Sequence, residues 1–157
     1  MKKFELTAEF VTNVFGKKLF RIKALVAFGN VEKGELGGFI ENEDNLSHDG
    51  NAWVSGDAQV SGDARVFGDA RVSGNARVFG DADYAVVTGF GRYFRATTFF
   101  RCEDKILRVQ CGCFYGDLAQ FREIVKKTHG DSKYAKEYLA IADLMELHFS
   151  DECGGEQ

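Results

Sequence analysis

The sequence of 157 residues predicts a mainly β fold, in which a short β-helix lies between an N-terminal β-hairpin and a C-terminal ββαα unit. The main observation is a six-residue repeat, because residues 50–85 read GNAWVS, GDAQVS, GDARVF, GDARVS, GNARVF and GDADYA. The second is composition, since the chain has 18 Gly and no Pro, and a Gly begins every hexad. The third is a change of pattern on both sides of the repeat.

The period of six fits short strands and excludes a helix. Six is not a multiple of 3.6, so a helix would scatter the repeated residues around its surface. In an extended chain, the Val of each hexad and the Ala two positions before it point to the same side. The Gly permits a positive φ, and the following Asp or Asn can hydrogen-bond to the nearby backbone. We therefore expect buried Val and Ala positions, separated by Gly corners.

The repeat resembles the hexapeptide repeat of left-handed parallel β-helices, in which a small residue follows an aliphatic one four positions later, as Ala58 follows Val54. The resemblance implies a single-stranded, left-handed β-helix in which three hexads form one triangular coil and residues 18 positions apart stack. Residues 36–54, 111–121 and 128–140 also resemble uncharacterised YdcK-like and phage or prophage hexapeptide-repeat proteins. This likeness implies a bacterial or phage setting and carries over no catalytic residues.

The flanking segments suggest caps at both ends of the β-helix. Residues 1–33 are expected to form the hairpin cap, residues 34–86 the β-helix with an irregular first coil, and residues 87–157 the ββαα unit. The two strands of that unit are expected over residues 94–102 and 106–114.

Two helices should follow these strands. Asp117 with Gln120 predicts a capped helix start. A second helix is expected from about Ser132 to Phe149.

Composition limits the function classes. The chain has 20 Lys and Arg against 24 Asp and Glu, a net charge of −4, which argues against a strongly basic nucleic-acid binder. Its start carries Glu5 and Glu9 where a secretion signal needs an apolar run, and no segment approaches the 18 apolar residues of a membrane span. We expect a cytoplasmic protein without a membrane partner, whose four Cys are free thiols.

The favoured function is non-enzymatic binding of a host protein of unknown identity by a phage or prophage protein that inhibits or recruits it. A defence-system antagonist such as an anti-CRISPR is one specific form. A rigid β-helix offers flat faces for such a partner, and a homo-oligomer is expected. The candidate protein-binding residues occupy outward positions of the repeat: Trp53, Arg65, Phe67, Arg71, Arg77 and Phe79. The alternative for Phe67 and Phe79 is packing against a terminal segment.

A second candidate is a nucleotide or nucleic-acid site, such as a sponge for a nucleotide signal. It would use a strip that interleaves cations and aromatic rings: Arg92, Tyr93, Arg95, Arg101, Lys105 and Arg108. Such a strip can stack bases and bind phosphates. The structural alternative is a sheet with one buried aromatic face and one charged face.

Enzyme and metal chemistry are minority hypotheses. A hexapeptide acyltransferase would need His48 as its general base, although an ordinary turn residue is the simpler interpretation. A zinc site would draw on Cys102, Cys111, Cys113 and His129, but their spacing matches no standard zinc pattern, and buried cysteines are the simpler interpretation. No catalytic residue, metal or cofactor is therefore predicted.

Overall fold

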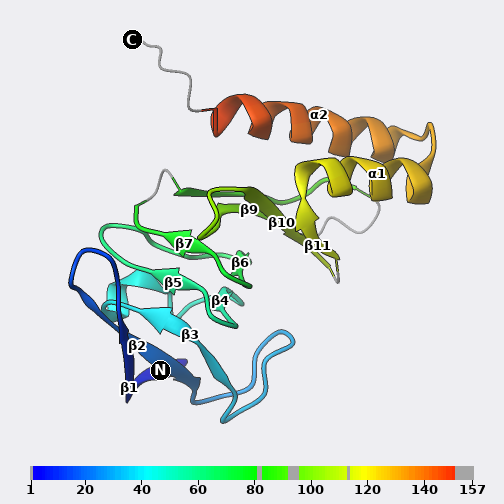
Figure 1. Cartoon of the computed structure of the whole chain (residues 1–157). Coiled ribbons are helices and arrows are strands. Elements are labelled where there is room, and N and C mark those ends of the chain that lie inside the picture. Colours follow the sequence, from blue (N-terminus) through cyan, green and yellow to red (C-terminus); the bar gives the residue numbers. More distant parts are fainter. Residues whose placement is uncertain (1, 81–82, 92–95, 113, 151–157) are drawn as a thin grey trace.

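The computed structural model describes residues 2–80, 83–91, 96–112 and 114–150. It is mainly β, with a β-solenoid and two C-terminal helices (Figure 1). Three layers follow one another along the molecule: the solenoid with its N-terminal hairpin, an antiparallel sheet, and the helix pair (Figure 1). None of the described helices is long and apolar enough to cross a membrane.

The N-terminal hairpin consists of β1 (Phe4–Thr12) and β2 (Lys18–Ala24), which pair antiparallel. Its turn is held by Asn13, whose Oδ1 accepts hydrogen bonds from the backbone N–H groups of Phe15 (2.9 Å) and Lys17 (3.0 Å). Strand β2 then pairs antiparallel with β3 (Leu36–Ile40) of the solenoid. The hairpin therefore extends one face of the solenoid, and that face becomes the five-stranded sheet β1-β2-β3-β5-β7.

The repeat forms parallel coils in the register expected from its period. Strand β4 (Trp53–Val54) pairs with β6 (Arg71–Val72), and β5 (Gln59–Val60) pairs with β7 (Arg77–Val78), always between residues 18 positions apart. The corner glycines at positions 50, 56, 62, 68 and 74 have φ between 63° and 73°, as expected. At Gly62 a Cβ atom would also lie 2.3 Å from a backbone oxygen of the next coil, so only Gly fits.

The first coil is irregular and longer. Ile40 pairs with Val60, and Leu46 with Val66, so these partners are 20 residues apart. A 3-10 turn, η1 (Glu43–Asn45), precedes Leu46. The two extra residues lie between Leu46 and Val54, because this step spans eight residues where the next coil uses six.

The solenoid core consists of the repeated Val and Ala side chains. All have zero exposed surface: Val54, Val60, Val66, Val72, Val78, Ala52, Ala58, Ala64, Ala70 and Ala76. The same cluster takes in Phe4 and Ile22 from the hairpin and Tyr84 and Phe100 from the C-terminal sheet. Both ends of the solenoid are therefore closed by apolar side chains from its neighbours.

Polar contacts also close the two ends. At the N-terminal end, the buried Lys3 Nζ donates to the carbonyls of Gly50 (3.3 Å) and Ala52 (2.8 Å). At the C-terminal end, the Arg71 N–H donates to Thr98 Oγ1 at 3.0 Å. These groups would otherwise face a missing coil, and unpaired buried backbone groups are costly.

The C-terminal sheet has four strands where the sequence analysis expected two. They are β8 (Tyr84–Val87), β9 (Thr97–Arg101), β10 (Leu107–Cys111) and β11 (Phe114–Asp117), in the order β11-β10-β9-β8. The sixth hexad leaves the coil, because Tyr84 pairs antiparallel with Phe100. The single strand expected over residues 106–114 is replaced by β10, which ends at Cys111, and by the start of β11 at Phe114.

The two helices, α1 (Leu118–His129) and α2 (Lys133–His148), agree with the sequence prediction. The Asp117 side chain accepts from the Gln120 N–H, and the Gln120 side chain accepts from the Asp117 N–H, so the expected cap is confirmed. Ser132 caps α2. Phe121 and Tyr138 pack with Phe99 and Val109 on one sheet face, while the opposite face covers the solenoid.

Candidate functional site

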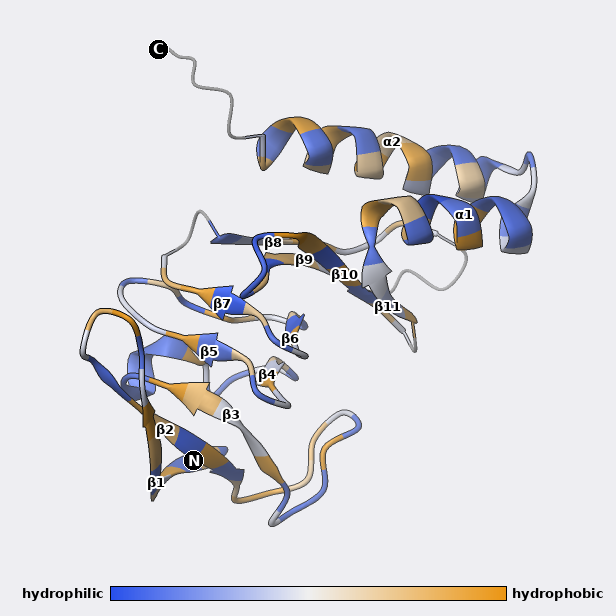
Figure 2. Cartoon of the chain, in the orientation of Figure 1, coloured by the Kyte–Doolittle hydropathy of each residue, from blue (hydrophilic) through white to orange (hydrophobic). Residues whose placement is uncertain are grey.

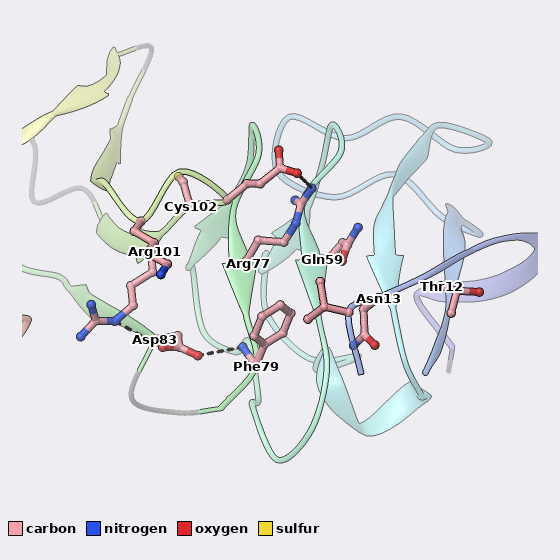
Figure 3. Close-up of a pocket in the computed structure, with 11 residues that line it drawn as sticks. Thr12, Asn13, Gln59, Arg77, Phe79, Asp83, Arg101 and Cys102 are labelled. Carbon is pink, nitrogen blue, oxygen red and sulfur yellow. Dashed lines mark hydrogen bonds and ion pairs between the residues drawn. The ribbon is translucent and has the colours of Figure 1, made fainter. Parts of the chain in front are cut away.

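A groove of about 620 Å³ opens where the hairpin, the solenoid and the C-terminal sheet meet (Figure 3). The solenoid supplies its floor, the hairpin turn supplies one wall, and the turn after β9 supplies the other. Its lining residues are Thr12, Asn13, Val14, Gln59, Arg77, Phe79, Asp83, Arg101, Cys102, Glu103 and Lys105. We call this feature the junction groove.

The hairpin turn beside the junction groove exposes two large apolar side chains. Val14 is 87% exposed and Phe15 is 67% exposed, although both lie in a tight turn where polar residues are usual. The Phe15 ring meets the Phe79 ring edge-on, with the centroids 5.5 Å apart. Figure 2 shows this turn as a hydrophobic segment beside the solenoid. We call Val14, Phe15 and Phe79 the apolar lip.

The floor and the opposite wall of the groove are cationic, and their arginines, Arg77 and Arg101, already have partners. Arg77 Nη1 donates to the carbonyls of Asp57, Asn75 and Ala76 at 3.0–3.2 Å, and Arg77 Nη2 lies 3.6 Å from a Glu103 carboxylate oxygen. Arg101 Nε lies 3.3 Å from Asp83 Oδ1 (Figure 3). These contacts fix the Arg77 guanidinium at the groove floor and the Arg101 guanidinium at the wall.

Asp83 and Lys105 complete this side. Asp83 Oδ2 accepts from the Phe79 N–H at 2.9 Å, so the same carboxylate positions the apolar lip. Lys105 is exposed and has φ 68° in the turn between β9 and β10. Within the described part of the chain, the Lys105 ammonium has no hydrogen-bond or ion-pair partner. It is therefore available to an anionic group.

The structure divides the predicted protein-binding residues among several surfaces. Arg77 and Phe79 line the junction groove. Phe67 is 56% exposed, and Arg65 and Arg71 are also exposed. Arg71 extends toward the C-terminal sheet, where its Nη1 lies 3.4 Å from the Gly112 carbonyl oxygen.

Trp53 pairs with Arg71 in the expected register, but its side chain is covered and is not an exposed binding residue. Trp53 is 4% exposed, because the loop between β2 and β3 folds over it. Phe28 of that loop meets the indole edge-on, with ring centroids 5.3 Å apart. The loop could not be anticipated from the repeat, because it lies upstream of every hexad.

The predicted basic strip does not form one surface. Arg101 pairs with Leu107, whereas Arg108 pairs with Phe100, so the two arginines lie on opposite faces of the sheet. Arg108 makes two hydrogen bonds to Asp104, at 2.8 and 2.9 Å, which raise the Arg108 pKa and lower the Asp104 pKa. Arg92, Tyr93 and Arg95 lie outside the described residues.

His48 has both ring nitrogens engaged. Its Nδ1 accepts from the Lys3 N–H at 3.0 Å, and its Nε2 lies 2.9 Å from Glu43 Oε1. The ring also stacks on Phe4, with centroids 4.2 Å apart. A general base needs a nitrogen open to its substrate, so this arrangement favours the role of fastening the first strand to the solenoid.

The candidate zinc ligands are separated by the sheet. Cys102 packs in the solenoid core, and burial raises the pKa of its thiol. Cys111 packs on the helix-covered face, where it accepts a hydrogen bond from Thr97 Oγ1 at 3.2 Å. His129 packs beside Tyr138, with ring centroids 5.8 Å apart. Cys113 lies outside the described residues.

Sequence analysis missed the hairpin side of the junction groove. Val14 and Phe15 were assigned to the cap and given no binding role. A signal was present, since two large apolar residues stand between Asn13 and Gly16, in the middle of a turn.

A family model described as the YdcK beta solenoid repeat matches residues 58–72 and 70–82. These segments cover the central hexads and include Gln59 and Arg77 of the groove floor. No curated protein matches the chain. The match agrees with the parallel coils of the structure, and it supports a YdcK-like β-solenoid repeat protein.

Proposed function

We propose that this chain is a non-enzymatic binding protein, encoded by a phage or prophage, that inhibits or recruits a host protein. An antagonist of a defence system, such as an anti-CRISPR, is one specific form of this proposal. The apolar lip carries the proposal, because it exposes large side chains around a formed groove. Exposed apolar groups beside a groove are typical of interaction sites.

The energy available to such an interface is substantial. Fully burying a Val or Phe side chain is worth roughly 1.5–3 kcal/mol. Val14 and Phe15 retain most of their surface in the free chain, so a partner could gain much of that energy from each. The hairpin turn that presents them is fixed by Asn13, which reduces the entropy lost on binding.

The proposal also includes left-handed winding of the coils, which the sequence resemblance implies, and the cytoplasmic location and homo-oligomer that were expected from the sequence. Parallel coils joined by Gly corners support a rigid scaffold. A rigid scaffold keeps the lip and the cationic side at a constant separation, which suits recognition of one surface.

A nucleotide site in the same groove is the second candidate. Arg101 and Lys105 of the predicted strip both line the junction groove, beside Arg77 and the Phe79 ring. This placement favours an anionic ligand with an aromatic ring. It is the weaker candidate, because Arg77 and Arg101 already contact groups of their own chain.

Site-specific photo-crosslinking in bacterial cells tests the protein-binding proposal. A benzophenone side chain would replace Phe15 or Phe67 in separate variants, and Phe90, which is 43% exposed at the end of the C-terminal sheet, would serve as the control. We expect a discrete host protein to be crosslinked from Phe15 or Phe67 and not from Phe90. Failure at both test positions, with the variants folded, would refute the proposal.

A further inference from the structure

We propose that the junction groove binds an acidic segment of its partner protein, with one apolar side chain of that segment seated on the apolar lip. This inference rests on the proposed function and adds the chemistry of the partner. Two properties of the groove lead to it: an excess of positive charge, and apolar side chains that project beyond the cavity.

The charge around the groove is opposite to that of the whole chain. The chain carries a net charge of −4. The groove is lined by Arg77, Arg101 and Lys105 against Asp83 and Glu103. The two carboxylates pair with the two arginines, at 3.3 and 3.6 Å. Lys105 therefore contributes uncompensated charge.

Lys17 adds a positive charge on the hairpin side. It is exposed, and its backbone is bonded to Asn13 in the same turn that carries the apolar lip. The turn that carries the apolar lip therefore also carries an exposed cation, so a partner that crosses this turn could place a carboxylate near Lys17 as well as near Lys105. Complementary charge of this kind favours the correct partner and accelerates association.

The shape favours a chain segment over a small ligand. Val14 lines the cavity but is 87% exposed, and the 67% exposed Phe15 is not among the lining residues, so a ligand confined to about 620 Å³ would leave most of their surface in water. A peptide that continues across the hairpin turn would cover them. An apolar anchor surrounded by polar contacts is the usual arrangement of a protein interface.

The cations favour a single point-charge contact over bidentate binding of an anion. Carboxylates and phosphates are both often held by a bidentate guanidinium, but Arg77 Nη1 is shared among three backbone carbonyls. The ammonium of Lys105 offers a point charge that needs no such geometry. A carboxylate of Asp or Glu could approach it without displacing an existing contact.

The test uses the full chain labelled with ¹⁵N and a defined probe, the peptide acetyl-Gly-Asp-Asp-Phe-Asp-Asp-Gly-amide. Two matched peptides replace its Phe by Ser or its Asp residues by Lys, and ATP is a separate probe. We expect the first peptide to shift the amide signals of Val14, Phe15 and Lys105. The two matched peptides should bind markedly more weakly.

Two variants locate the interaction. Phe15→Ser should weaken binding of the acidic peptide about ten-fold, because it removes the lip contact. Lys105→Glu should weaken it about five-fold, because a surface charge pair becomes a repulsion. Both side chains are exposed, so the fold should persist. Lys127→Glu, which alters an exposed lysine of α1, should leave binding unchanged.

Each of the following results would overturn the inference. The inference of an acidic partner segment would be refuted if the acidic and lysine-containing peptides bound equally well. It would also be refuted if millimolar peptide left the amide signals of the groove residues unchanged. Groove shifts with ATP alone would assign the groove to a small anionic ligand. Self-association that Phe15→Ser abolishes would assign it to a second copy of the chain. Cellular crosslinking from Phe15 or Phe67 without peptide binding would refute this inference while leaving the proposed function intact.

Discussion

The buried Lys3 predicts an unusual dependence of stability on alkaline pH. Its side chain is 4% exposed, and its Nζ donates to the carbonyls of Gly50 and Ala52. Burial lowers the Lys3 pKa from 10.5 to about 8, although the Asp49 carboxylate acts in the opposite direction. A neutral amine keeps two N–H donors, so both hydrogen bonds can persist after the proton is lost.

The two Lys3 pKa values, in the folded and the unfolded chain, determine how the free energy of unfolding changes with pH. Below about pH 8 the folded and unfolded chains both hold the proton, and folding bears the full cost of burying the charge. Between about 8 and 10.5 the folded chain releases its proton first, so the free energy of unfolding rises with pH. At 1.36 kcal/mol for each pKa unit, the complete gain is roughly 3 kcal/mol.

Urea unfolding followed by circular dichroism can measure this gain. Between about pH 7.5 and about pH 9.5, the wild-type free energy of unfolding should gain roughly 2 kcal/mol relative to that of Lys3→Met. The comparison cancels the other groups that titrate in this range, because both proteins share them. Parallel pH profiles for the two proteins would refute the reasoning.

Three further predictions concern the stability of the fold, each checked by chemical denaturation. Val66→Ala should cost roughly 1–3 kcal/mol by opening a core cavity, whereas Val14→Ala should change stability little, since Val14 is 87% exposed. Asp117→Ala should cost about 1 kcal/mol through loss of the helix cap, and Asp117→Asn should retain most of it. Gly62→Ala should cost more than about 1 kcal/mol, because the added Cβ would lie 2.3 Å from the Phe79 carbonyl oxygen at φ 64°. Wild-type stability in all three destabilising variants would contradict the described packing.

Local patterns made the repeat and the helix caps predictable. Side chains alternate between two faces in any extended chain, so the sequence alone predicts that the repeated Val and Ala share one face, and both are buried. The Asp117 cap depends on two residues three positions apart. Each pattern involves residues only a few positions apart, so it can be recognised without knowledge of distant contacts.

The junction groove was not predictable because it depends on distant contacts. Its floor and walls include residues 12–14, 77–79 and 101–105, which are brought together by the register of the sheets. Trp53 shows the same limitation, since its burial depends on Phe28 in a loop that no repeat describes. The division of the basic strip also follows from strand pairing, which places Arg101 and Arg108 on opposite faces.

Because the sheet β1-β2-β3-β5-β7 joins the hairpin to Arg77, the geometry of the groove depends on the number of hexads between them. The hairpin turn and the Arg77 side chain share one of three sides of the coil. Inserting one hexad between them would move every later residue to the next side of the coil. The hairpin turn and the Arg77 side chain would then lie on different sides. Inserting three hexads would restore the alignment and move the walls apart by one strand spacing, about 4.8 Å. The number of hexads therefore determines two properties of the groove. Its remainder after division by three decides whether the hairpin turn and Arg77 lie on the same side of the coil, and the number of complete coils sets the distance between them along the axis.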